Sequence, residues 1–354
     1  MQHSYPIKVK EVRRETVDCV SVSFDIPENL RTEFQFKPGQ YLNIIKTIHG
    51  EEFHRSYSLC VSPLSMEYRV AIKKVEGGKF STFANDHLKA GDTLELMPPN
   101  GKFTRPILAN QSKHYLLIAA GSGITPILSL LSTILEVESQ SSVCLIYGNT
   151  TIDHIIFRNQ LLDLKNIYHE RLQLNFVLSR EWVEEECFQG RIDGHKLLQY
   201  NGKIFHATDL DEVFLCGPES MILDCKSTLL SLGIPESNIH FELFGTEIKK
   251  SHKVVELKTN AEFSKIRLKT DGRTTEFDLA FNTQSILDAA LAKKVNLPYA
   301  CKGGVCCTCK AKLVEGEVEM AKVYGLEKDE IEAGYILTCQ SYPKTSKIMV
   351  DFDQ

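Results

Sequence analysis

The stretch that decides the organisation of this chain lies near its end, where residues 301–309 read CKGGVCCTC. Cys301, Cys306 and Cys309 have the spacing C-x4-C-x2-C, and Cys339 supplies a fourth thiol. This is the plant-type ligand pattern of a [2Fe–2S] cluster, in which bridging sulfides supply only half of each iron's sulfur environment. Glycines in the loop allow tight wrapping, with backbone N–H groups turned toward the sulfurs. The spacing predicts these four cysteines as metal ligands.

Two other interpretations of the cysteines remain open. A zinc site also uses four cysteines, but it usually pairs two short C-x2–4-C knuckles, and this sequence has one. Cysteines can also be small buried packing residues. Cys307 lies between the predicted ligands at spacings that fit no usual cluster, so we interpret it as a packed residue. A transfer of ligand duty to Cys307 is the minor alternative.

Composition sets limits on the remaining possibilities. The 354 residues exceed one ordinary core and predict two or three domains. A net charge of −5 gives no reason to expect nucleic-acid binding. Eleven cysteines without an apolar leader favour metal binding in a reducing compartment, and we expect the cytoplasm. The most apolar stretch, residues 115–135, is broken by glycine and proline and reads as strand, turn and helix, so no membrane span is expected.

The pattern of apolar residues changes along the chain and predicts three domains. Residues 1–108 contain short runs between Pro and Gly turns, such as residues 20–26, 41–45 and 69–75, and predict an antiparallel β-barrel. Residues 109–245 alternate apolar runs with helical patterns, which predicts an α/β domain with a parallel sheet. Residues 246–264 are Lys-rich and weakly periodic, as in a linker. Residues 265–354 contain a hairpin turn at Asp271-Gly272, a helix near 285–294 and the cysteine loop.

Two motifs in the first domain suit a flavin. In Arg55-Ser56-Tyr57-Ser58, the arginine can clamp a pyrophosphate, the tyrosine can stack on an isoalloxazine ring and Ser58 can bond the N5 edge. A glycine turn opening a short helix could hold cofactor phosphates on its N–H groups, although a plain Gly-Gly hairpin turn is the alternative. That second motif consists of Gly77, Gly78, Lys79, Phe80, Ser81 and Thr82.

Two motifs in the second domain suit a nucleotide. A strand-to-helix turn carries glycines that permit close phosphate approach, although it lacks the third glycine of the dinucleotide fingerprint. Cys216-Gly217-Pro218 follows another apolar strand, which favours a nicotinamide-facing Cys216 over a packed one. The turn consists of Gly121, Ser122, Gly123, Ile124, Thr125 and Pro126.

Together these motifs resemble the ferredoxin–NADP reductase superfamily along the whole chain, and within it the reductase components of phenylacetyl-CoA epoxidases. Similar text includes residues 297–306 (LPYACKGGVC), 333–340 (AGYILTCQ), 145–149 (LIYGN) and 190–194 (GRIDG). The resemblance implies an FAD-binding barrel, an NAD(P)-binding α/β domain and a C-terminal β-grasp ferredoxin domain. It also implies catalytic roles for Tyr57, Ser58 and Cys216.

The resemblance implies NADPH as electron donor, with one departure. Thr150 stands where the family often has a basic residue that could help hold a 2′-phosphate, and its presence argues against NADPH. Ser179-Arg180 resembles the pair that grips the 2′-phosphate, so NADPH is favoured over NADH. A solvated loop arginine is the alternative for Arg180.

By resemblance, electrons pass from NADPH to FAD, to the [2Fe–2S] cluster and to a separate di-iron oxygenase, the phenylacetyl-CoA epoxidase. The chain has no pair of Glu-x-x-His motifs, so the ring chemistry is expected elsewhere. Two alternatives stay open: a stand-alone NAD(P)H–ferredoxin-type reductase for another oxygenase or a desaturase, and a passive electron carrier with degenerate reductase modules.

Overall fold

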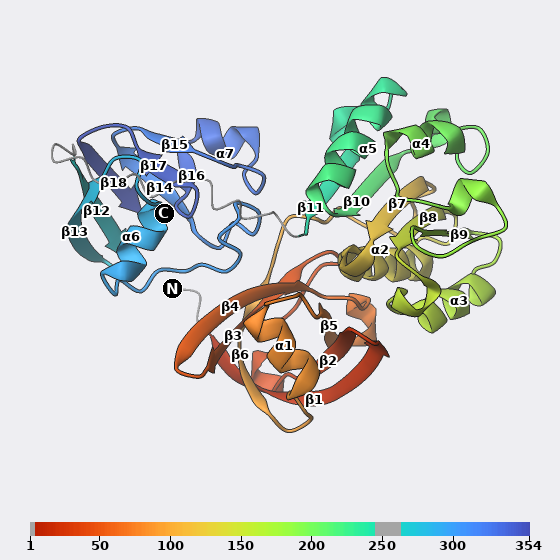
Figure 1. Cartoon of the computed structure of the whole chain (residues 1–354), viewed down its shortest axis with the longest axis horizontal. Helices are drawn as coiled ribbons and strands as arrows, with labels where there is room; N and C mark the ends of the chain where they lie inside the picture. Colours follow the sequence, from red (N-terminus) through yellow and green to blue (C-terminus); the bar gives the residue numbers. More distant parts are fainter. Residues whose placement is uncertain (1–3, 245–262) are drawn as a thin grey trace. The chain divides into compact units, whose positions relative to one another are not determined.

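The computed structural model describes residues 4–244 and 263–354. These residues form two compact units, one built around the two sheets before residue 245 and the other around the sheets after residue 262 (Figure 1). The predicted linker, residues 246–264, lies outside the described residues except for its last two, which begin a strand. The boundaries at 108, 245 and 264 stay predictions.

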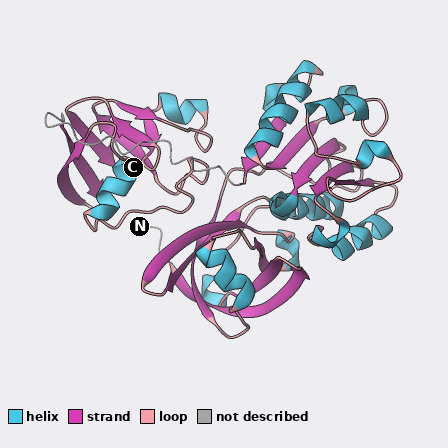
Figure 2. Cartoon of the chain, viewed as in Figure 1, coloured by secondary structure: helices cyan, strands magenta, loops and turns pink. Residues whose placement is uncertain are grey.

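The first sheet is a six-stranded antiparallel barrel with strand order β4-β3-β6-β1-β2-β5, as predicted. A bridge between Leu59 and Val70 brings the chain after β4 to β5, so the edge strands meet. Val20, Val22 and Phe24 fill the core from one side of β2, and α1 covers the barrel (Figure 2). The elements are β1 (Tyr5–Thr16), β2 (Cys19–Asp25), β3 (Tyr41–Ile48), β4 (Glu51–Ser58), β5 (Tyr68–Lys73), α1 (Lys79–Asp86) and β6 (Thr93–Asn100).

The second sheet is parallel throughout, with order β11-β10-β7-β8-β9, which confirms the predicted α/β domain with a parallel sheet. The helices α2 and α3 cover one face and α4 and α5 the other (Figure 1). The strand order runs from β7 outward through β8 to β9, and the chain then returns to place β10 on the other side of β7. The strand order therefore reverses between β7 and β10, and ligands bind at such topological switch points. The elements are β7 (His114–Ala120), α2 (Ile124–Val137), β8 (Ser142–Asn149), α3 (Arg158–Ile167), β9 (Leu172–Leu178), α4 (Gly194–Tyr200), β10 (Glu212–Gly217), α5 (Glu219–Ser231) and β11 (Ile239–Leu243).

One helix of this domain begins later than its sequence pattern indicates. The apolar spacing predicts a helix over residues 155–164, whereas α3 begins at Arg158. Phe157 has φ +61°, and this left-handed conformation interrupts the backbone before the helix. Ile155 and Ile156 are buried as loop residues, so they contribute to the core without extending the helix.

The barrel and the α/β domain share a buried interface within their unit. The Ser129 hydroxyl of α2 donates to the Val61 carbonyl at 2.6 Å. The Ser62 hydroxyl donates to the Glu136 carboxylate at 2.5 Å. Cys60 and Phe103 of the barrel side belong to the same apolar cluster as the residues of α2. These contacts fix the end of the barrel strands against the sheet that carries the nucleotide motifs.

The second unit has a mixed five-stranded sheet, order β13-β12-β18-β14-β16, with β12 parallel to β18 and α6 packed on it, as expected of a β-grasp ferredoxin. The predicted hairpin turn is confirmed, since Asp271 and Gly272 have φ +48° and +69° between the paired Thr270 and Arg273. Ser285 caps α6 by accepting the Asp288 N–H at 3.1 Å. The elements are β12 (Phe263–Thr270), β13 (Arg273–Ala280), α6 (Ile286–Ala292), β14 (Lys310–Glu315), β15 (Val318–Met320), α7 (Lys328–Glu332), β16 (Tyr335–Leu337), β17 (Ser341–Pro343) and β18 (Lys347–Asp351).

Candidate redox-cofactor sites

The cysteine loop turns its backbone donors toward the predicted ligand sulfurs. The N–H groups of Gly303 and Cys306 donate to Cys301 Sγ at 3.3 and 3.4 Å. The Cys306 side chain and these backbone groups lower the pKa of Cys301 below its ordinary value, against the opposing effect of burial. Gly304 has φ +77°, which lets the loop close on itself. A loop that favours the thiolate of Cys301 suits a metal centre, because the thiolate is the ligand form.

The four predicted ligands lie as two pairs. The Cys301 N–H donates to Cys306 Sγ at 3.4 Å, and Thr338, which precedes Cys339, donates to the Cys309 carbonyl through its N–H at 3.2 Å and its hydroxyl at 3.0 Å. Among the described residues, no group of three or more Cys, His, Asp or Glu side chains is placed for a single ion. A [2Fe–2S] cluster takes two thiolates per iron, whereas zinc takes four ligands at one point. The two pairs suit the two irons of such a cluster.

Cys307 is oriented differently from its neighbours. Its thiol donates to the Gly325 carbonyl, and its side chain packs against the core of this unit. Its backbone has φ +53°, which turns it out of line with Cys306. These contacts suit the packed role expected of Cys307.

The predicted flavin strand is β4, which carries Arg55, Ser56, Tyr57 and Ser58. The Tyr57 ring stacks on Phe80 of α1, with centroids 5.7 Å apart and an interplanar angle of 29°. Phe80 is itself in the barrel core. The structure thus brings the two predicted flavin motifs together through this ring pair. An aromatic ring held near the end of a strand suits a stacked isoalloxazine.

The predicted glycine turn precedes α1. Gly77 has φ +71°, and Gly78 precedes the first residue of the helix, Lys79. The Ser81 hydroxyl donates to the Gly78 carbonyl at 3.1 Å and accepts the Val75 N–H at 3.1 Å. Ser81 therefore shapes the turn, while the predicted phosphate contacts of Gly77, Gly78, Lys79, Phe80, Ser81 and Thr82 stay predictions.

The predicted nucleotide turn lies at the switch point between β7 and β10. Gly121, Ser122 and Gly123 form a single 3-10 turn that leads into α2. A Cβ on Gly123 would lie 2.1 Å from the Cys216 carbonyl oxygen, so only glycine fits there. The buried Tyr147 hydroxyl donates to the Gly121 carbonyl at 2.9 Å and supports the turn from β8. Such close backbone approach suits a phosphate-binding turn.

A cavity of about 620 Å³ opens at this turn and is lined by five of the predicted nucleotide residues. Gly121, Ser122, Ser179, Gly217 and Pro218 line it. The predicted Thr125 and Pro126 are buried in the first turn of α2, and the Thr125 hydroxyl donates to the Ser122 carbonyl at 3.0 Å. Their direct contact with a cofactor stays a prediction.

Two arginines belong to the surroundings of this cavity. Arg180 directly follows the lining residue Ser179 and is exposed, and its backbone N–H donates to the Thr150 carbonyl at 2.8 Å. Arg191 lines the cavity directly. No role for Arg191 was predicted from the sequence. Arg191 belongs to residues 190–194 (GRIDG), one of the segments that resemble the reductase family, and this resemblance is the sequence feature that could have identified it.

A carboxyl group that no sequence motif marked meets two predicted catalytic residues. Ser58 Oγ donates to Glu242 Oε2 at 3.2 Å. Glu242 is opposite Cys216 in the register of β10 and β11. Burial raises the pKa of Glu242 to about 8, opposed by the Ser58 hydrogen bond. Burial also raises the pKa of the Cys216 thiol well above its ordinary value, with a further contribution from Glu242. At neutral pH the centre therefore holds a neutral acid and a neutral thiol.

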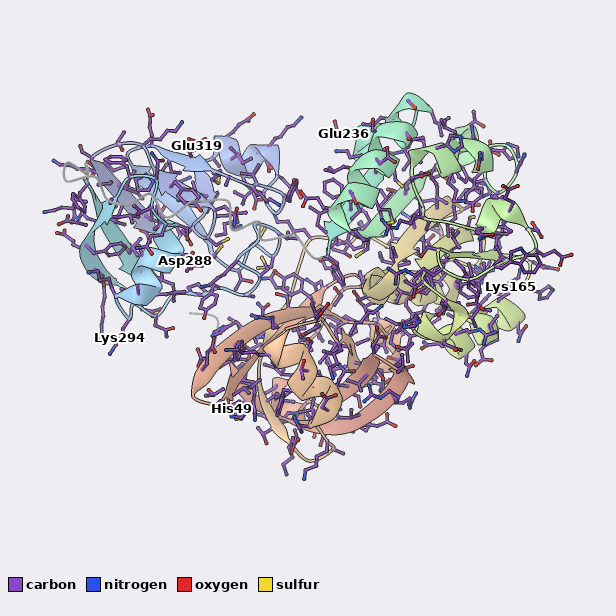
Figure 3. All side chains as sticks on the ribbon, in the orientation of Figure 1. His49, Lys165, Glu236, Asp288, Lys294 and Glu319 are labelled. Carbon is purple, nitrogen blue, oxygen red and sulfur yellow. The ribbon has the colours of Figure 1, made fainter. Side chains whose placement is uncertain are left out.

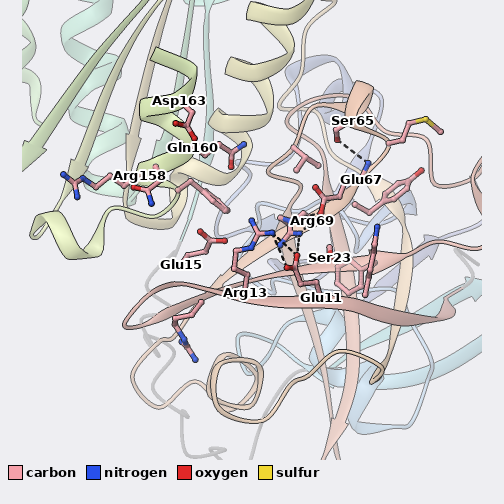
Figure 4. Close-up of a pocket in the computed structure, with 18 of the residues that line it drawn as sticks. Glu11, Arg13, Glu15, Ser23, Ser65, Glu67, Arg69, Arg158, Gln160 and Asp163 are labelled. Carbon is pink, nitrogen blue, oxygen red and sulfur yellow. Dashed lines mark hydrogen bonds and ion pairs between the residues drawn. The ribbon is translucent and has the colours of Figure 1, made fainter. Parts of the chain in front are cut away.

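A larger cavity, of about 1080 Å³, lies elsewhere in this unit, between β1, β2, β5 and the start of α3 (Figure 4). Charged side chains that line it pair with one another. Arg69 Nη2 contacts Glu11 at 2.5 Å and Glu67 at 2.6 Å, and its Nη1 donates to Ser21 at 2.9 Å. None of the predicted site residues lines it, and we assign it no cofactor.

The family models match three successive parts of the chain. The oxidoreductase FAD-binding domain matches residues 6–104, the oxidoreductase NAD-binding domain residues 117–227, and the 2Fe-2S iron-sulfur cluster binding domain residues 268–344. FAD-, pyridine-nucleotide- and [2Fe–2S]-binding domains are thus all present. Among the described residues, no helix is long and apolar enough to cross a membrane.

Individual relatives match over nearly their full lengths. One 1,2-phenylacetyl-CoA epoxidase subunit, from Escherichia coli (strain K12), is 44% identical over 99% of this chain and 98% of the relative. The ferredoxin reductase component of 3-ketosteroid-9-alpha-monooxygenase from Rhodococcus rhodochrous is 31% identical over 98% and 96%. Solved phthalate dioxygenase reductase shares the fold, with TM-score 0.62, 22% identity and coverage of 99% and 98%. The chain therefore belongs to the family of FAD- and [2Fe–2S]-dependent oxygenase reductases that includes the epoxidase subunit and the ketosteroid monooxygenase component.

Proposed function

We propose that this oxidoreductase carries electrons from NADPH to a di-iron oxygenase, the phenylacetyl-CoA epoxidase, in the degradation of phenylacetate. The observation that carries the proposal is the 44% identity to the epoxidase subunit over 99% of the chain, so that every domain has a counterpart. The cytoplasm is the proposed location.

Ser58, Glu242 and Cys216 are proposed to form the centre where hydride transfer takes place. When bound, FAD accepts a hydride from the nucleotide and releases the electrons singly to the cluster. Ser58 orients its hydroxyl by donating to Glu242 at 3.2 Å. The neutral Glu242 carboxyl and the buried Cys216 thiol place no negative charge where electron density arrives. Tyr57, stacked on Phe80, provides the ring against which a planar cofactor can pack.

The remaining nucleotide contacts are proposed for the turn and the two arginines. The 3-10 turn at Gly121–Gly123 offers backbone N–H groups to a pyrophosphate. Ser179 lines the cavity and Arg180 follows it, so the pair can reach a 2′-phosphate. Arg191, which also lines the cavity, supplies a second guanidinium. Two arginines at this cavity support NADPH over NADH.

Electrons are proposed to leave through a cluster held by Cys301, Cys306, Cys309 and Cys339. The acidic run of α7 is a poor candidate for the whole docking surface. Glu327 and Glu330 form a capping box, and Glu330 also pairs with Lys310 at 3.0 Å. These carboxylates are therefore engaged within the domain, which leaves Asp329 and Glu332 as the exposed acids outside the capping box.

Reconstitution tests the proposal directly. The purified reductase is mixed with the oxygenase subunits of phenylacetyl-CoA epoxidase, and NADPH oxidation is measured against epoxide formation. We expect coupled turnover with NADPH and weaker turnover with NADH. Cytochrome c reduction without any epoxide would reject the partner and favour a reductase for another oxygenase, as the 31% identical ketosteroid monooxygenase component illustrates. Absence of both activities would favour a passive carrier.

A further inference from the structure

A short segment, residues 321–326, lies against the cysteine loop, and we name it the cover segment. The Gly325 N–H donates to the Gly304 carbonyl at 2.9 Å. The Cys307 thiol donates to the Gly325 carbonyl, so Gly325 is bound to the loop on both sides. At the other end of the segment, the Ala321 N–H donates to the Gln340 carbonyl at 2.9 Å. The cover segment is therefore attached to both parts of the chain that carry predicted ligands.

The fit of the cover segment depends on glycine at two facing positions. A Cβ on Gly325 would lie 2.6 Å from Cys307 Sγ and 2.6 Å from the Val305 carbonyl oxygen. A Cβ on Gly304 would lie 2.9 Å from the Lys322 carbonyl oxygen. Gly325 lies outside the left-handed region, so space rather than backbone conformation requires glycine there. Alanine at Gly325 would push the cover segment off the loop.

One stretch of the loop links the cover segment to a predicted ligand sulfur. The carbonyl of Gly304 accepts from the Gly325 N–H at 2.9 Å. The N–H groups of Gly303 and Cys306, on either side of that contact, donate to Cys301 Sγ at 3.3 and 3.4 Å. Cys306 also directly precedes Cys307, whose thiol donates to the Gly325 carbonyl. Displacing the cover segment thus disturbs the donors to Cys301.

We infer that the cover segment is a positioning element: through Gly325 and the Cys307 thiol, it holds the N–H groups of Gly303 and Cys306 on the sulfur of Cys301 and so tunes the midpoint potential of the cluster. The inference rests on the proposed cluster ligands. N–H donors to the sulfurs stabilise the reduced cluster, which carries the extra negative charge, and they raise its potential. Loosening the segment weakens these donors and makes the potential more negative.

The test uses the full chain with its cluster in place and compares three variants. Cys307→Ala removes the thiol donor, Cys307→Ser replaces it with a hydroxyl donor, and Gly325→Ala forces the 2.6 Å contacts apart. The readouts are a redox titration followed by electron paramagnetic resonance and the rate at which a chelator extracts iron. We expect a more negative potential and several-fold faster iron loss for Cys307→Ala, a larger change for Gly325→Ala, and values close to the parent protein for Cys307→Ser.

A control separates positioning from general destabilisation. Gly334→Ala strains a φ of +83° in the same domain with no atom closer than 3.7 Å to the new Cβ, so it should leave the potential unchanged. If Gly325→Ala fails to retain a cluster, the two Cys307 variants decide the matter. Parent-like potentials for Cys307→Ala, or equal shifts for Cys307→Ala and Cys307→Ser, overturn the inference. A parent protein that assembles no cluster overturns the proposed function instead.

Discussion

The hydroxyl of Ser58, at the end of barrel strand β4, lies 3.2 Å from the carboxyl of Glu242 in the last strand of the parallel sheet. This bond joins the flavin motif to the nucleotide domain at the point where the two predicted cofactors would meet. Glu242 is partly buried, and among the described residues no basic side chain contributes to the shift of its pKa. The relationship makes the charge of Glu242 a variable that pH can control.

We expect the rate of flavin reduction to fall as pH rises through about 8. The pKa of Glu242 is raised to about 8 by burial, so the carboxyl is neutral below that pH and negative above it. A negative charge beside Ser58 opposes the arrival of a hydride. Stopped-flow measurement of flavin bleaching across the pH range checks this. Glu242→Gln should be flat across the same range, whereas Glu236→Gln, an exposed site labelled in Figure 3, should behave like the parent protein. An unchanged profile in Glu242→Gln would contradict the assignment.

The Gly123 contact predicts a steric requirement in the nucleotide turn. Gly123→Ala places a Cβ 2.1 Å from the Cys216 carbonyl oxygen. The backbone must move to relieve this steric clash. We expect a loss of about 1–3 kcal/mol in the free energy of unfolding, typical of overpacking, together with a raised KM for the nucleotide. Thermal unfolding and steady-state kinetics measure both.

Gly121→Ala serves as the matched control for that turn. Gly121 has φ +52°, but nothing lies within 4 Å of its Cβ position. Backbone strain alone should cost about 1–2 kcal/mol. If the two variants lose the same stability and the same affinity, the contact with Cys216 is not what restricts position 123.

The sequence predicted the parts of the fold that have strong periodicity. The apolar run at residues 172–178 predicts a strand, and these residues form β9, because such a run between turn signals has few alternatives. The predicted start of α3 at residue 155 was wrong, because Phe157 adopts a left-handed conformation that no sequence rule anticipates for phenylalanine. In the last domain, the strands β15, β16 and β17 are three residues each, too short to show a period.

The candidate sites divide in the same way. Cysteine spacing and glycine turns are local signals, and they could be read directly. Glu242 becomes informative only when β11 lies beside β10 and the barrel brings Ser58 to it, which is a tertiary relationship. One local signal was present, since Glu242 is the lone acid in the apolar text FELF. A carboxyl group in a largely buried strand contributes nothing to solubility, so its presence there favours a functional role for Glu242.

The predicted 2′-phosphate contact is tested by Arg180→Ala. The loop should keep its place, because the backbone N–H of Arg180 holds the Thr150 carbonyl at 2.8 Å. A lost charge-assisted contact of about 1.5–3 kcal/mol corresponds to roughly 10- to 150-fold in KM for NADPH. KM for NADH should change little. Arg158→Ala, on α3, is a control for the loss of an arginine outside the nucleotide cavity. Equal effects on both nucleotides would show that Arg180 does not read the 2′-phosphate.

The ligand assignment is tested by five single Cys→Ser variants read through the visible spectrum. Cys301, Cys306, Cys309 and Cys339 should each be required for the cluster absorption. Cys307→Ser should retain it, because the Cys307 thiol donates to the Gly325 carbonyl. A cluster that disappears in Cys307→Ser but survives in one of the other variants means that the ligand set is wrong.

The last prediction concerns the exit of electrons, and it follows from the separate cores. The barrel and the α/β domain fill their cores with residues before 245, and the ferredoxin domain fills its own with residues after 262. Removing residues from 246 onward should therefore leave a folded flavin reductase. Ferricyanide reduction by NADPH should persist, because a small acceptor can take electrons from the flavin directly. Turnover of the oxygenase should be lost, because the cluster is the proposed point of exit. Flavin content and thermal unfolding confirm that the truncated protein is intact. If it still drives the oxygenase at the full-length rate, electrons leave from the flavin, and the four cysteines at 301, 306, 309 and 339 serve another purpose.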